Sequence, residues 1–180
     1  MIFEIIISKK IMDHKLIIEG LERNQKVFEQ LFQGISREEY IWKDKSDRWC
    51  LLEIICHLYD EEREDFRKRT THVLNTPDQQ FEPIDPEGWV LKRAYMNQEY
   101  DTTLNNFLEE RKVSIRWLRS LVNPQWNNIS IHPEAGEMTA QQFIANWLAH
   151  DYLHFRQITM LKLDYLEYTS KEDFSYAGGW

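Results

Sequence analysis

Long apolar runs are missing from this sequence. No stretch approaches the roughly 18 consecutive apolar residues that a membrane-spanning helix requires. The opening MIFEIIISKK has no basic segment ahead of its apolar stretch and carries Glu4 inside it, so we do not expect a signal peptide. The sequence therefore predicts a chain that does not enter a membrane.

Positive charge is also in short supply. The chain has 22 Lys and Arg against 30 Asp and Glu, which gives a net charge of −8. Phosphate backbones and anionic membrane surfaces repel a protein of this charge. We therefore expect neither nucleic acid nor an anionic membrane as a partner.

Cysteine is scarce as well, with only Cys50 and Cys56. Six residues apart on a predicted helix, the two side chains point in different directions and cannot easily form a disulfide. Neither has a CxxC spacing or a basic environment, so we interpret both as small hydrophobic residues rather than nucleophiles. This usage is typical of a reducing compartment and predicts a cytoplasmic protein.

The length and composition predict a single folded domain over residues 1–180. A chain of 180 residues suits one core, and 42% hydrophobic with 29% charged residues is typical of a folded protein. The first helical period begins only after Met12, so residues 1–11 read as an extension, and both Met1 and Met12 stay open as the native start.

Apolar residues recur at helical spacing in four segments, which predicts an all-α four-helix bundle. The expected helices are 13–33, 50–72, 95–122 and 140–163. Thr139 and Gln142 form a T-x-x-Q capping box at the start of the last helix. Long inter-helix loops follow at 34–48, 73–94 and 123–138. Residues 164–180 have five aromatic residues and no helical period, so we expect an extended C-terminal tail lying over the bundle.

Three histidines carry the clearest chemical signal. His150 and His154 are four residues apart on a predicted helix, so they project from one face and can share one metal ion. An HxxxH pair alone is weak, because two histidines satisfied by hydrogen bonds give the same pattern. His57 lies on the second helix, along a line that partly faces the bundle interior. Three neutral imidazoles would leave coordination positions open on a divalent ion, as in catalytic sites.

The local sequence around these histidines resembles a known family. WCLLEIICHLYDEE at 49–62, HPEAGEMT at 132–139 and AHDYLHFRQI at 149–158 resemble the DinB/YfiT-like superfamily of metal-dependent enzymes. The resemblance implies a four-helix bundle with a divalent metal on His57, His150 and His154. It also implies thiol-dependent transferases as relatives, and a homodimer, which the many aromatic residues also favour. Cys50 stands where the family commonly has a capping serine or threonine before Glu53.

Other polar residues could reach a substrate pocket beside the metal. Arg111 could hold a substrate carboxylate, although an ion pair with a neighbour such as Glu53 is the stronger interpretation. His132 could face a substrate or transfer a proton, with loop packing as the stronger alternative. Glu61 could act as a base or support a ligand, yet within DEERED it reads as a solvated residue. The remaining pocket candidates are Asn24, Asn146 and Trp147.

These features favour a metal-dependent enzyme that acts on a small molecule. The reaction would be a transfer that uses a low-molecular-weight thiol, or a hydrolysis. Zinc, nickel, iron and manganese all suit imidazole ligands, so the sequence does not select the ion. The alternative is a non-catalytic binding or dimerisation module with a structural metal or none.

Overall fold

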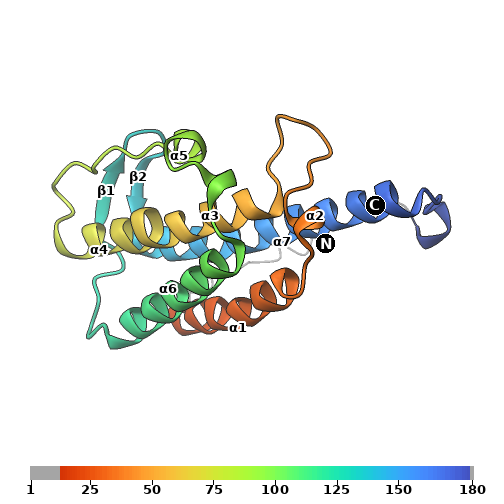
Figure 1. Cartoon of the computed structure of the whole chain (residues 1–180). Helices are drawn as coiled ribbons and strands as arrows, with labels where there is room; N and C mark the ends of the chain where they lie inside the picture. The colour runs from red at the N-terminus through yellow and green to blue at the C-terminus, as the bar shows by residue number, and fades with distance from the viewer. Residues whose placement is uncertain (1–12, 179–180) are drawn as a thin grey trace, which may run out of the picture.

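The computed structural model describes residues 13–178 and is chiefly helical (Figure 1). It confirms the four-helix bundle. The second bundle helix is composite, because a π-helical turn at Glu62–Arg67 joins α3 to α4. The bundle consists of α1 (His14–Phe32), α3 (Leu51–Glu61) continued by α4 (Lys68–Asn75), α6 (Tyr100–Ser120) and α7 (Ala140–Ser170). The extension expected at 1–11 lies outside the described residues. Within 13–178, no helix is both long and apolar enough to cross a membrane.

The three long connections contain short elements that the sequence did not reveal. The first holds α2 (Arg37–Tyr40), and the second holds α5 (Pro86–Lys92) with a 3₁₀ turn at Tyr95–Asn97. The third folds into an antiparallel hairpin of β1 (Ile129–His132) and β2 (Gly136–Thr139), in which Ile129 pairs with Thr139. Strands of four residues are too short to show clear alternation, so the expectation of a plain loop here was wrong.

Three of the four predicted helix starts agree with the structure. The third was wrong, because α6 begins at Tyr100 rather than near 95 and a 3₁₀ turn occupies Tyr95–Asn97. The Thr139 hydroxyl accepts the Gln142 N–H at 3.2 Å, and the Gln142 side chain accepts the Thr139 N–H at 2.8 Å, which confirms the capping box. At the start of α3, the Cys50 N–H donates to the Glu53 carboxylate at 2.9 Å. Glu53 therefore caps the helix although Cys50 replaces the usual hydroxyl residue.

The boundary expected for the C-terminal tail was wrong. The last helix does not end near 163, because α7 continues to Ser170 and ends where Lys171 adopts a left-handed conformation. Tyr165 and Tyr168 lie on this extra length and pack on the Trp42 ring, each with ring centroids 5.5 Å apart. Two of the five aromatic residues that suggested an extended strap are thus helical contacts. Only the residues that follow Ser170 form the tail.

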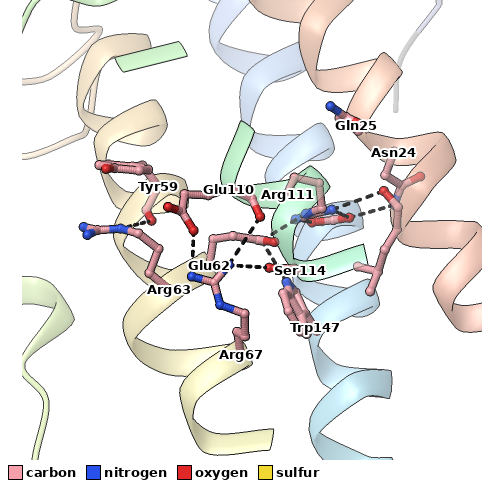
Figure 2. A network of polar contacts seen from close by, with 12 residues as sticks. Asn24, Gln25, Tyr59, Glu62, Arg63, Arg67, Glu110, Arg111, Ser114 and Trp147 are labelled. Atoms are coloured by element: carbon pink, nitrogen blue, oxygen red, sulfur yellow. Dashed lines mark hydrogen bonds and ion pairs between the residues drawn. The ribbon is translucent and has the colours of Figure 1, made fainter. Parts of the chain in front are cut away.

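A buried polar network crosses the centre of the bundle (Figure 2). Arg111 on α6 is only 1% exposed, and its Nε donates to Glu62 at 2.9 Å. Its two Nη atoms donate to the two carboxylate oxygens of Asp151 on α7, both at 2.7 Å. Asn24 on α1 also donates to Asp151 at 3.0 Å, and the Trp147 indole donates to Glu62 at 3.0 Å. One guanidinium therefore links all four bundle helices.

Replacing Arg111 with methionine should strongly destabilise the fold. The change keeps much of the side-chain volume but leaves the Glu62 and Asp151 carboxylates buried without their cation, which costs about 3–5 kcal/mol of unfolding free energy. Urea unfolding followed by circular dichroism measures it. The control is Arg119→Met, because Arg119 pairs with Glu22 on the surface and its loss should cost no more than about 1 kcal/mol. Equal effects of the two changes would contradict the role assigned to Arg111.

Candidate metal centre

Three imidazoles meet between α3 and α7. His57 comes from α3, while His150 and His154 come from successive turns of α7. The Nε2 atom of His150 lies 3.4 Å from Nε2 of His57 and 3.0 Å from Nε2 of His154. The ligand atoms of all three lie within 4.8 Å of one another. The structure thus brings together the three histidines that the sequence singled out.

Burial keeps these histidines uncharged. His57 and His154 are each 7% exposed, and His150 is half-buried. Burial, assisted by the nearby His154, lowers the pKa of His57 to about 3. Burial also lowers the pKa of His154, and burial with the two neighbouring histidines holds the pKa of His150 well below its usual range. Three neutral imidazoles offer lone pairs to a cation at physiological pH.

The two nitrogens of each imidazole ring have different surroundings, and in each ring it is Nε2 that faces the cluster. The Nδ1 atoms of His57 and His154 are buried and make no hydrogen bond within the described residues. Each Nε2 atom, in contrast, faces another imidazole nitrogen, an arrangement that a cation among the three would stabilise. No carboxylate, cysteine or further histidine of residues 13–178 joins the group. The residues present therefore fit a divalent ion with three protein ligands.

Aromatic residues enclose the three imidazoles. The Trp49 ring lies 4.8 Å from the His57 ring, and the Phe66 ring lies 5.0 Å from the His150 ring, measured between centroids. Trp49 also borders a groove of about 600 Å³ between the 44–49 segment and α7, together with Gln157 and Leu161. None of the three histidines lines this groove, so Trp49 is the contact between the groove and the cluster.

Glu61 is buried, contrary to the expectation that it is solvated. It lies one helical turn after His57 and is only 5% exposed. Burial, together with the neighbouring Asp65 carboxylate, raises the pKa of Glu61 to about 9, so this carboxyl keeps its proton at neutral pH. The run of charged letters concealed this residue, because the local pattern does not show which side of the helix α7 covers.

Three of the predicted pocket residues belong to the central polar network instead. Arg111, Asn24 and Trp147 all bond to Glu62 or Asp151, as described above. Arg111 forms a structural ion pair, as the stronger interpretation held, but Glu53 is not its partner. The Glu53 carboxylate instead accepts from Lys43 at 2.8 Å. Asp151 follows His150 directly on α7, so the network that holds Asp151 also fixes the direction in which His150 points.

The other two predicted pocket residues lie apart from the histidine cluster. Asn146 is exposed and donates to the Gln142 carbonyl at 2.8 Å, which is a local helix contact. His132 lies on β1, where its ring faces Arg69 of α4. Sequence reasoning missed Trp49 at the groove, although it lies within a sequence block that carries the family resemblance.

Comparisons with known proteins agree with this architecture. A comparison with curated proteins gives no match. Among solved structures, YfiT from Bacillus subtilis matches with a TM-score of 0.75 at 18% sequence identity, over 85% of this chain and 89% of that chain. YfiT is described as a probable metal-dependent hydrolase with an unusual four-helix bundle topology. The likeness supports the fold. The family model of the DinB superfamily matches residues 20–158, and the chain therefore belongs to the DinB superfamily.

Proposed function

We propose that this protein is a metal-dependent enzyme that acts on a small molecule. His57, His150 and His154 hold one divalent ion, which is zinc, nickel, iron or manganese. The observation that carries the proposal is the convergence of three neutral imidazoles from two helices on one point, with no other hydrogen-bond partner for their Nε2 atoms among residues 13–178. The description of YfiT as a probable metal-dependent hydrolase supports it.

The number of protein ligands favours catalysis over a structural role. Structural zinc sites are closed by four protein ligands, whereas catalytic sites keep a position for water or substrate. Here the described residues supply three ligands, and Trp49, which packs on His57, borders a groove of about 600 Å³. The non-catalytic module would need neither feature, so we favour the enzyme.

The chain's own residues prepare the site for this chemistry. When bound, the ion would supply a Lewis acid that lowers the pKa of a water or thiol ligand. Trp49 and Phe66 exclude water from two sides of the imidazoles. Glu61 holds a proton on its carboxyl one turn from His57. Arg111 fixes Asp151, and with it the rotation of α7 that points His150 and His154 toward α3.

The nucleophile comes from outside the protein. Burial raises the pKa of Cys50 to about 11 and that of Cys56 to about 12, so neither thiol supplies a thiolate near neutral pH. Two reactions then suit the site: hydrolysis, with water as the nucleophile, and group transfer to a low-molecular-weight thiol. In both, the substrate is a small electrophile.

Removing any one of the three histidines should abolish tight metal binding. His57→Ala, His150→Ala and His154→Ala each remove a ligand, and metal content per chain should fall by at least about tenfold, because each ligand contributes several kcal/mol to the site. Elemental analysis after purification without an affinity tag measures the content. His14→Ala and His72→Ala are matched controls and should keep the wild-type value. Wild-type content in the His150→Ala, His154→Ala double variant would contradict the site.

Activity should require the metal and reveal the nucleophile. We expect metal-loaded protein to convert members of a panel of small electrophiles, and the metal-free protein and His150→Ala to be inactive. Turnover that needs added thiol indicates the transferase, whereas turnover in its absence indicates the hydrolase. Turnover that persists unchanged after complete metal removal would rule out both.

A further inference from the structure

Arg69 and His132 meet at the hairpin end of the seam between the second bundle helix and α7. Arg69 lies on α4, is 7% exposed, and has its Nε 3.1 Å from the Asp65 carboxylate. Its Nη1 atom lies within hydrogen-bond reach of Nε2 of His132. Among the described residues, Asp65 is the only carboxylate within ion-pair distance of Arg69. A buried guanidinium thus presents its outer edge to an imidazole rather than to an anion.

Both ring nitrogens of His132 face N–H donors, although a neutral imidazole can accept at only one of them. Its Nδ1 faces the backbone N–H groups of Glu134 at 3.2 Å and Ala135 at 3.1 Å, while its Nε2 faces the Arg69 guanidinium. A neutral imidazole accepts at only one nitrogen, and a protonated one accepts at neither. Whichever nitrogen carries the hydrogen, one N–H of the ring points at another N–H. The pair lacks an acceptor.

The surroundings leave room for such an acceptor. The Arg69 guanidinium lies 5.2 Å from the Phe81 ring, and the Phe143 ring lies 6.3 Å from the His132 ring. Arg69 and Phe81 also border a cavity of about 160 Å³, which Lys68, Glu64 and Glu82 line as well and which His132 does not. His132 is half-buried and the following turn is exposed, so a small group can enter from solvent. Apolar walls strengthen a charge-assisted hydrogen bond by excluding water.

We propose that Arg69 and His132 bind an anionic group, a carboxylate or a phosphate, which is the acidic end of the molecule that reacts at the metal centre. The anion accepts from the Nη atoms of Arg69 and from Nε2–H of His132. The Nδ1 atom of His132 then accepts from the Glu134 and Ala135 N–H groups, and every donor has a partner. The planar guanidinium suits two-pronged binding of such oxyanions.

The position of this site defines the substrate class. His132 packs near Phe143, which lies seven residues before His150 on α7, a rise of about 10 Å along the helix. The ligand is therefore a small molecule with an acidic group on the order of 10 Å from its reacting atom. This second part rests on the proposed function, whereas the anion site itself does not.

Binding of inorganic phosphate to the metal-free protein tests the anion site. We expect phosphate to shift the ring NMR signals of His132 in a saturable way. Arg69→Met should weaken binding at least about tenfold, the loss expected from removing charge-assisted hydrogen bonds. Arg67→Met is the matched control on the same helix, because Arg67 faces Glu110 and Ser114, and it should bind as wild type does. If Arg69→Met does not fold, His132→Phe provides a second variant, whose phosphate binding is compared with that of the wild type by titration calorimetry and should be weaker.

Two results would overturn the anion site. The first is a wild-type protein whose His132 signals do not respond to phosphate. The second is an equal loss of binding in Arg69→Met and Arg67→Met, which would mean that phosphate responds only to net charge.

A pair of thiols tests whether the anion belongs to the substrate. Cobalt-loaded protein is titrated with a mercaptocarboxylic acid whose carboxylate lies about 10 Å from its sulfur, and with the mercaptoalcohol of equal length, while the thiolate absorption is followed. The acid should bind at least about tenfold more tightly, and Arg69→Met should remove this difference. Equal affinities alongside normal phosphate binding would mean that the site takes a free anion, which overturns the link to the substrate. Failure to bind cobalt would contradict the proposed function, and the phosphate result would still decide the anion site.

Discussion

The fold and the candidate site both depend on the buried ion pair between Arg111 and Asp151. Asp151 lies between His150 and His154 on α7, and neighbouring residues of a helix point about 100° apart. Holding Asp151 toward Arg111 on α6 therefore turns the two histidines toward α3. Glu62 extends the same arrangement to the second bundle helix, because it accepts from both Arg111 and Trp147. The network that joins the helices also sets the geometry of the imidazoles.

The three charged groups of this network, Arg111, Glu62 and Asp151, are all buried. One guanidinium faces two carboxylates in a place without solvent, and burial raises the pKa of Glu62. Burying ions costs more than most ion pairs return, so replacing one member alone is far more harmful than exchanging the whole set for apolar residues. A stable apolar core could have been built here with less risk. These charges fix the orientation of α7, because Asp151 pairs with Arg111 only when α7 is turned this way.

The sequence predicted what local patterns can show. The HxxxH pair, the T-x-x-Q capping box and the spacing of the bundle helices are relations between residues close in the chain, and the structure reproduces each of them. Long-range relations were harder. Arg111 was expected in an ion pair, but its partners Glu62 and Asp151 lie 49 and 40 residues away and could not be selected over Glu53. Tyr165 and Tyr168 looked like an extended strap because their partner, Trp42, lies far away in the sequence, in the segment that follows α2.

The two ends of the seam between the second bundle helix and α7 have complementary chemistry. Neutral imidazoles converge at one end and suit a cation, while hydrogen-bond donors converge on Arg69 and His132 at the other and suit an anion. Between them, Glu61 keeps its proton beside Asp65. A molecule with a reactive group at one end and an acidic group at the other would satisfy both ends at once.

X-ray absorption spectroscopy of the metal-loaded protein in solution tests the central claim most directly. The account predicts three imidazole nitrogens around the ion, with the remaining positions filled by water or an added ligand, and a loss of one imidazole in His57→Ala. A spectrum with four protein ligands, or one unchanged by His57→Ala, would contradict an open three-histidine site between α3 and α7.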